Sequence, residues 1–272
     1  MKKIFKTLSI VVGFALIVGI LFVGNAFVGN PVSKMLAKNT AEKYINQQYA
    51  NTDYLVEKVY YNFKDGGYYA KISSPSSVDT YFSVAITSLG KLCWDSYEDM
   101  VTSKRNTWDR VDNEYRKISE AVFDGADFPY DSDISFGSIR EKYSAEQDSI
   151  YKNFGLDAET LVLDKLYDVR ELGAKYGDIT FYAHDETVSV KRAAEILIDI
   201  TKILDENNVP FYSISFVLQK PRVDDMPNPD NSTIHLTDFL HSDIYKSDLE
   251  KRVQKSHEET TAYFAAQDAK YK

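Results

Sequence analysis

The apolar and polar positions of the chain follow helical and strand periods in turn, and the first clear helical stretch begins at Asn30-Pro31. Asparagine caps helices well, and proline is tolerated at the first helical position. The apolar spacing then follows a helical stripe through Gln48. The side chains expected to face inward are Val32, Met35, Leu36, Tyr44 and Ile45.

Strand signals follow this helix. Runs rich in Val, Tyr and Phe, separated by turn residues, predict four antiparallel strands at residues 54–63, 68–72, 80–86 and 92–97. A second helix is predicted from Asn106, with an apolar stripe made of Trp108, Val111, Tyr115, Ile118 and Val122. A helix, a meander of four strands and a further helix form an α+β unit, expected to span residues 30–125.

The segment DGADFPY at residues 124–130 interrupts the periodicity and predicts a boundary between two units. The clearest later pattern is a β-α-β element: a strand at 178–183, a helix from about Val188 to Glu206 with Asp185 as candidate N-cap, and a strand at 211–218. Shorter strands near 134–139 and 234–236 and a helical tail from about residue 243 complete a second unit, residues 126–272. The expected fold class is α+β, with two small units after an N-terminal segment.

Residues Leu8–Val28 carry no charge and follow the basic flank MKKIFK. A helix of this length would measure roughly 30 Å, enough to cross the hydrocarbon core of a bilayer. Cleavable signals have an apolar stretch of only about 7–15 residues, so an uncleaved transmembrane signal anchor over residues 1–29 is favoured, although Gly24-Asn25-Ala26 offers a cleavage site. The flanking lysines Lys2, Lys3 and Lys6 favour a cytoplasmic N-terminus, whereas Lys34, Lys38 and Lys43 beyond the segment weaken that inference. The expected location is the cell membrane, with a single pass and the body outside the cytoplasm.

The 272 residues include 32 Lys and Arg against 41 Asp and Glu. The first 29 residues hold three of these lysines and no acid, so the remaining body has 29 basic and 41 acidic residues and a formal charge of −12. Such a balance disfavours nucleic acid and anionic lipid surfaces as partners, and it suits cations or basic segments of another protein.

Cys93 is the single cysteine, which excludes an internal disulfide. It lies in a predicted apolar strand beside Trp94 and has no histidine near it in the sequence. The expected state is therefore a buried structural thiol rather than a reactive one.

The stretch YYNFKDGGYY at residues 60–69 predicts a β-hairpin. A two-residue turn, at Asp65-Gly66 or one residue later, places Tyr61, Phe63 and Tyr68 on the core face of the sheet. Tyr60 and Tyr69 then lie on the opposite, polar face. This pair is the candidate binding surface of the chain.

Acidic residues supply the candidate metal ligands. Asp224, Asp225 and Asp230 lie in the loop-like segment KPRVDDMPNPDNS and are the candidate calcium ligands. A second acidic set consists of Asp124, Asp127, Asp131 and Asp133. Neither set has the D-x-[DN]-x-[DN]-G spacing that aims alternate oxygens at one ion, so solvated turns are the competing interpretation. No other cofactor is expected.

Histidine occurs at only four positions. The run HLTDFLHSD contains His235, Asp238, His241 and Asp243, but neither helical nor extended spacing brings three of them to one zinc ion. His184-Asp185 lies where a predicted strand meets a predicted helix, a place where open α/β sheets bind ligands; a turn histidine followed by a helix cap is the simpler interpretation. No G-x-S-x-G nucleophile elbow is present.

Several stretches resemble the YfjL-like family of bacterial, mainly Gram-positive, membrane-anchored proteins. They are FVGNPVSKMLAKNTAEKY, YYNFKDGGYYAKISSPSSVDTYFSV, KLCWDSYEDMV and NVPFYSISFVLQKPR. The family has no assigned catalytic residues, so the resemblance implies an envelope protein without implying an activity. The helix and meander of the first unit also resemble cystatin-like and PepSY-type domains in architecture, and such folds serve as inhibitors, sensors and structural modules.

These patterns leave two hypotheses about function. The first is a membrane-anchored protein whose two units bind another protein or a cell-envelope component. The second is an envelope hydrolase that uses carboxylates of the C-terminal unit and a divalent cation. An acidic surface with exposed tyrosines would favour binding, whereas three or more Asp, Glu or His side chains gathered in a pocket would favour the hydrolase. Because no catalytic motif is present, binding is the favoured hypothesis.

Overall fold

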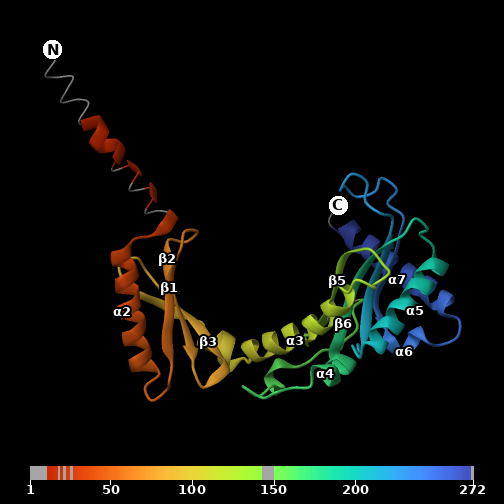
Figure 1. Cartoon of the computed structure of the whole chain (residues 1–272), viewed down its shortest axis with the longest axis horizontal. Coiled ribbons are helices and arrows are strands. Elements are labelled where there is room, and N and C mark those ends of the chain that lie inside the picture. The colour runs from red at the N-terminus through yellow and green to blue at the C-terminus, as the bar shows by residue number, and fades with distance from the viewer. Residues whose placement is uncertain (1–10, 18, 21–22, 25–26, 143–149, 271–272) are drawn as a thin grey trace, which may run out of the picture. The chain divides into compact units, whose positions relative to one another are not determined.

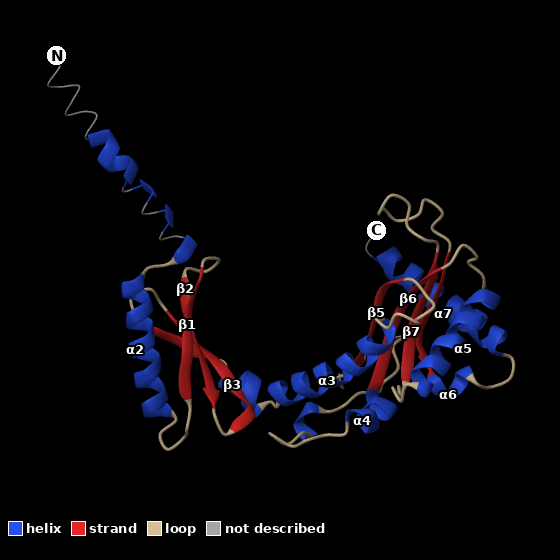
Figure 2. Cartoon of the chain, in the orientation of Figure 1, coloured by secondary structure: helices blue, strands red, loops and turns tan. Residues whose placement is uncertain are grey.

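A computed structural model describes residues 11–17, 19–20, 23–24, 27–142 and 150–270 of the chain. The chain divides into two units, residues 1–107 with 162–164 and residues 108–161 with 165–272 (Figure 1). Each unit contains helices and one four-stranded sheet (Figure 2). The expected α+β class is therefore confirmed.

The segment predicted to cross a membrane, residues 8–28, lies partly outside the described residues, because 8–10, 18, 21–22 and 25–26 are not among them. Its described residues are helical. In the described part of the chain, no helix combines the length and the apolar character that a membrane span requires.

The first unit packs one helix against an antiparallel meander, as the periodicity predicts. The helix is α2 (Pro31–Gln48), and the strands, in sheet order, are β1 (Leu55–Asn62), β2 (Gly67–Ser74), β3 (Ser77–Ile86) and β4 (Leu92–Asp95). The helix begins where the sequence indicates, since the side chain of Asn30 accepts a hydrogen bond from Ser33 N at 2.7 Å. Gly29, with φ of +74°, leads into this cap, and a Cβ there would lie 2.7 Å from the Tyr68 hydroxyl.

The buried face of α2 differs from the predicted stripe. Its buried residues are Ser33, Ala37, Ala41 and Ile45, whereas Val32, Met35 and Leu36 are exposed. Small side chains let the helix approach the sheet closely, so the alanines take the core positions and the larger apolar side chains point away from it. Only Ile45, among the predicted stripe residues, is buried.

A short segment from late in the chain completes the first unit. Residues 162–164 belong to it, and Leu163 packs against its core. Asp164 and the buried Asp79 of β3 bind each other reciprocally: Asp164 N donates to Asp79 Oδ2 at 2.8 Å, and Asp79 N donates to Asp164 Oδ1 at 3.0 Å. Strand β3 is therefore held by a part of the chain that is more than 75 residues away in sequence.

Helix α3 (Arg105–Phe123) carries the predicted apolar stripe, but its buried apolar side chains belong to the core of the second unit. Val111 and Tyr115 are fully buried there, and the Tyr115 hydroxyl donates to Pro210 O at 2.9 Å. The units divide between residues 107 and 108, at the start of this helix, and not after residue 125. A stripe shows that a helix packs against something, but not which sheet receives it.

The second unit contains the predicted β-α-β element. Strands β6 (Gly177–His184) and β7 (Ser213–Gln219) are parallel and are joined through helix α5 (Val190–Glu206). The antiparallel strands β5 (Ser132–Ile139) and β8 (Thr233–Leu240) lie outside them, in the order β5-β6-β7-β8. The remaining helices are α4 (Val169–Tyr176), α6 (His241–Ile244) and α7 (Leu249–Lys270).

Two local features of this unit depart from the predictions. The N-cap of α5 is Ser189, whose side chain accepts from Arg192 N, and not Asp185. Asp185 lies further upstream, where it accepts from Thr187 N at 2.8 Å and pairs with the Arg192 side chain at 2.8 Å. Helix α4 was not predicted, because its eight residues are too few for a clear period.

Candidate functional site

The hairpin of β1 and β2 sets the positions of the candidate tyrosines. Tyr60 is opposite Tyr69 and Tyr61 is opposite Tyr68, so the two pairs lie on opposite faces as predicted. Tyr68 is fully buried under α2, while Tyr60 is 43% exposed. The connection is a four-residue loop rather than a two-residue turn, and Phe63 lies in this loop, 58% exposed, instead of facing the core. A four-residue loop preserves the alternation of faces, which explains why the tyrosines were placed correctly and Phe63 was not.

Tyr60, which is exposed, and Tyr69, which is half-buried, belong to a set of three aromatic rings at one register of the sheet. The register Tyr60–Tyr69–Ala85–Trp94 runs through all four strands. The rings of Tyr60 and Tyr69 are stacked with centroids 5.7 Å apart, and Trp94 meets Tyr69 edge-on at 5.9 Å. Trp94 is 51% exposed. We call Tyr60, Tyr69 and Trp94 the aromatic row; it lies on the sheet face that α2 leaves open.

A carboxylate fixes the central ring of the aromatic row. The Tyr69 hydroxyl donates to Asp65 Oδ2 at 2.5 Å, and Asp65 also accepts from Gly67 N and from the Asn62 side chain. The hydrogen bond between them raises the pKa of Tyr69 and lowers the pKa of Asp65, so the ring stays a neutral phenol beside a charged carboxylate. A groove of about 440 Å³ lies alongside, lined in part by Asp65, Tyr69 and Trp94.

Cys93 also lines this groove, and it is exposed. The prediction of a buried thiol is therefore wrong. Strand β4 is the edge of the sheet and pairs only with β3, so its apolar composition does not mean that both of its faces are covered.

A second polar site lies at the carboxyl ends of the parallel strands β6 and β7. His184 ends β6, and its ring is almost fully buried between two carboxylates: Nδ1 lies 3.1 Å from Asp131 Oδ2, and Nε2 lies 3.0 Å from Asp133 Oδ2. Gln219, at the end of β7, places its Nε2 within 3.1 Å of both Asp133 and His184.

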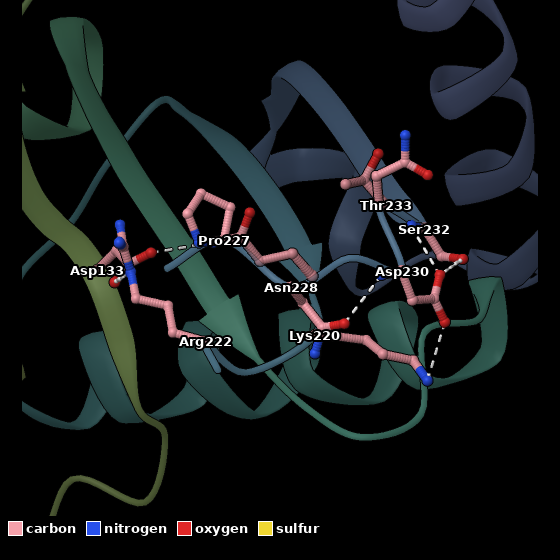
Figure 3. A pocket seen from close by; sticks show the side chains of 10 residues that line it. Asp133, Lys220, Arg222, Pro227, Asn228, Asp230, Ser232 and Thr233 are labelled. Atoms are coloured by element: carbon pink, nitrogen blue, oxygen red, sulfur yellow. Dashed lines mark hydrogen bonds and ion pairs between the residues drawn. The ribbon is translucent and has the colours of Figure 1, made fainter. Parts of the chain in front are cut away.

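Asp133 is held by a cation as well. Arg222 Nε donates to Asp133 Oδ1 at 2.9 Å, and this contact, reinforced by His184, lowers the pKa of Asp133 (Figure 3). The sequence suggested the junction at His184 but not these partners, which the pairing of β5, β6 and β7 brings together. A cavity of about 180 Å³ lies beside them.

The candidate calcium ligands line or flank this cavity without forming a cluster. Asp230 binds Lys220 Nζ at 3.0 Å and accepts from Ser232 N and Oγ (Figure 3). These contacts lower the pKa of Asp230 to about 2. Asp224 and Asp225 occupy left-handed turn positions. Throughout the described residues, no group of three or more His, Cys, Asp or Glu side chains is arranged to hold a metal ion.

The other histidine run is also dispersed. His235 and Asp238 lie in β8, and His235 stacks on Phe264, while His241 begins α6 and contacts Asp205 at 3.1 Å. Asp238 is fully buried and binds Arg140 through both oxygens, Nη1–Oδ2 at 2.6 Å and Nη2–Oδ1 at 2.5 Å. His235, Asp238 and His241 therefore contact different partners within the second unit.

Arg140 also reaches Asp178 Oδ2 at 2.8 Å and stacks over the ring of Phe154. Burial opposes its charge, but the hydrogen bonds and attraction from Asp238 and Asp178 outweigh burial and raise the pKa of Arg140. Burial conversely raises the pKa of Asp178, although Arg140 opposes this shift. We call Arg140, Asp178 and Asp238 the buried ion cluster. Both carboxylates contact the one guanidinium, so the evident role of the cluster is to hold β6, β8 and the end of β5 together.

Comparison with known protein families gives two matches. A model described as "YfjL-like, N-terminal domain" matches residues 1–95, and one described as "YfjL-like C-terminal domain" matches residues 114–254. No curated protein and no solved structure matches the chain.

Proposed function

Taking as a premise that the chain belongs to the YfjL-like family, we propose that it is a membrane-anchored binding protein of the cell envelope. The aromatic row of the first unit is its binding surface, and an envelope saccharide is its ligand. The predicted apolar segment at residues 8–28 anchors it, with the body outside the cytoplasm.

The aromatic row is the observation that carries this proposal. Exposed Tyr and Trp rings present apolar faces against which the C–H groups of a sugar ring can pack, and such rings are common in binding surfaces because they combine large area with few rotatable bonds. Three of them in register across a sheet form a platform longer than one ring. The stacked and edge-on contacts, together with the Asp65 hydrogen bond, hold the rings in place before any ligand arrives.

Polar groups beside the platform supply the complementary chemistry. Asn62 ends β1 and Asp65 lies in the hairpin loop, where the two side chains bond to each other and Asp65 also accepts from Tyr69 and Gly67. The second N–H of the Asn62 amide and the remaining lone pair of the Asp65 carboxylate are the groups that could bind sugar hydroxyls. The groove of about 440 Å³ gives room for a sugar unit next to Trp94. Apolar stacking faces flanked by a few oriented polar groups therefore match a carbohydrate better than an apolar ligand.

The alternative function, a cation-dependent hydrolase, receives less support from the same geometry. Arg222 pairs with Asp133, and Lys220 pairs with Asp230, so these carboxylates of the C-terminal unit are already neutralised by side chains. Binding two of their oxygens to a divalent ion would require those contacts to break.

The test is isothermal titration of the full chain, embedded in lipid nanodiscs, with the β-1,4-linked tetrasaccharide of N-acetylglucosamine. Trp94→Ala is expected to weaken binding roughly 10-fold, because an aromatic contact contributes about 0.5–1.5 kcal/mol beyond its buried area. Tyr60→Ala is expected to act in the same direction. Tyr245→Ala, at an exposed tyrosine of the second unit, is the matched control and should leave binding unchanged.

Two results would count against the proposal. Equal affinities for the Trp94→Ala variant and the parent protein would remove the aromatic row as the site. Cleavage of the tetrasaccharide that needs added Ca²⁺ or Mg²⁺ would support the hydrolase instead.

A further inference from the structure

Three structural features of the first unit meet at one end of its sheet. The backbone N–H of Asn30, just before α2, donates to the hydroxyl of Tyr68, near the start of β2, at 2.8 Å. Tyr68 pairs with Ile86, at the end of β3, so the β1–β2 loop and the β3–β4 turn lie at this same end. Thr40 Oγ1 of α2 donates to Gly90 O of that turn at 2.8 Å. In Figure 1 the N-terminal helical residues lead into α2 at the end where β1 and β2 are connected.

Large apolar side chains project from this end. Phe63 in the β1–β2 loop is 58% exposed, Leu89 in the β3–β4 turn is 87% exposed, and Val28 next to α2 is 79% exposed. The rings of Phe27 and Phe63 are in contact, with centroids 6.2 Å apart, so the loop touches the last turn of the predicted anchor. Val32 and Met35, in the first turns of α2, are exposed as well, and we include them in the set. We call this set the anchor-side surface.

The local charge of the anchor-side surface is opposite to that of the body. Its two turns and the first turn of α2 contain Lys34, Lys64 and Lys91, and a single acid, Asp65. The Asp65 carboxylate is occupied by Tyr69, Gly67 and Asn62. The body as a whole carries a formal charge of −12 and would be repelled by anionic headgroups. The local charge at this end of the first unit therefore favours approach to an anionic surface.

We propose that the anchor-side surface inserts into the headgroup region of an anionic lipid bilayer, as a second membrane contact of the first unit beyond the predicted anchor. Phe63 and Leu89 reach the apolar boundary, and Lys34, Lys64 and Lys91 extend to the headgroup phosphates. The inference rests on the proposed membrane anchor, since the chain leaves α2 directly into the apolar segment. It also accounts for the exposed apolar residues of α2, which would otherwise face water.

The test places single nitroxide labels on the full chain in vesicles of phosphatidylglycerol and phosphatidylethanolamine. Cys93→Ser removes the native thiol, and Phe63→Cys or Leu89→Cys introduces one at each tip. Val78→Cys is the matched control, because Val78 is an exposed apolar residue beside the β2–β3 turn, at the other end of the sheet. At positions 63 and 89, accessibility to a water-soluble nickel chelate is expected to be several-fold lower than at position 78, and accessibility to oxygen higher.

A label at Ile20→Cys distinguishes failure of the proposed bilayer contact from failure of the proposed membrane anchor. Chelate protection at position 20, with positions 63 and 89 as accessible as position 78, would overturn the bilayer contact and leave the anchor intact. Full chelate access at position 20 would overturn the anchor, and the bilayer contact with it. Because all the labelled side chains are exposed, substitution there is not expected to unfold the protein; an unchanged circular dichroism melt checks this.

Discussion

Replacing Arg140 by leucine should destabilise the second unit strongly. The guanidinium makes two hydrogen bonds to Asp238 and one to Asp178. Asp238 is fully buried and Asp178 nearly so, and leucine would leave both carboxylates without their cation. Breaking a buried ion pair in this way costs about 3–5 kcal/mol. The donors left on the two carboxylates, the Lys152 backbone N–H on Asp238 and the Ser213 hydroxyl on Asp178, favour the lower part of that range.

The stability that Arg140→Leu removes should depend on pH, and the direction of that dependence follows from the raised pKa of Asp178. Burial raises the pKa of Asp178 above the ordinary value of 3.8. The folded state then holds the proton more tightly than the unfolded state, so the stabilisation is complete below about pH 3.8 and is lost as pH rises through the folded-state pKa. Without Arg140 that pKa rises further. The deficit of the Arg140→Leu variant should therefore shrink as the pH is lowered from 7 toward 4.5.

Tryptophan fluorescence can isolate the unit concerned, because Trp94 lies in the first unit and Trp108 in the second. In a Trp94→Phe background, urea unfolding followed through Trp108 should show the loss of about 3–5 kcal/mol, equivalent to roughly 6–20 °C in melting temperature for a domain of this size. Arg140→Leu combined with Asp178→Asn is the control, and it should recover part of the loss. A loss below about 1 kcal/mol, the range of an exposed pair, or one equal at pH 7 and 4.5, would refute the reasoning.

Three further outcomes are expected. Gly29→Ala should destabilise the first unit by about 1–3 kcal/mol, because φ is +74° and the new Cβ would lie 2.7 Å from the Tyr68 hydroxyl; an unchanged urea midpoint read through Trp94 would contradict this. Cys93 should react with Ellman's reagent in the native protein nearly as fast as in urea, and strong native protection would argue against its exposure. Lys220→Met should move the pKa of Asp230 upward from about 2 toward 3.8, so the folding contribution of this contact, present above pH 3.8 and lost as pH falls toward 2, should diminish; carboxyl NMR titration measures this.

Periodicity predicted the helices and strands of this chain better than it predicted which of them pack against one another. The strands and the β-α-β element follow from alternation and from runs of β-branched residues, which depend only on local sequence. The buried face of α2 was missed because Ala37 and Ala41 give a weak apolar signal, although close packing on a sheet favours small residues. Tyr115 was assigned to the first unit because a helical stripe carries no information about which core receives it.

In the candidate site, too, local sequence predicted some features, and others depend on how the strands pair. Alternation within one hairpin was enough to place Tyr60 and Tyr69 together on the outer face. Adding Trp94 required the register of β3 with β4, which the sequence does not encode locally. The partners of His184 come from β5 and β7, whose order in the sheet is a property of the tertiary fold.

The segment at residues 162–164 has a consequence for how the protein is synthesised. The first unit ends its main stretch at residue 107, but the partner of Asp79 is Asp164, which is made 57 residues later. At translation rates of about 5–20 residues per second, that interval is roughly 3–11 s. During this time the hydrogen bond from Asp164 N to Asp79 has not yet formed, while β5 and part of the second core have already been made. The two units therefore mature in an interleaved order along the nascent chain, and the N-terminal unit is not finished first.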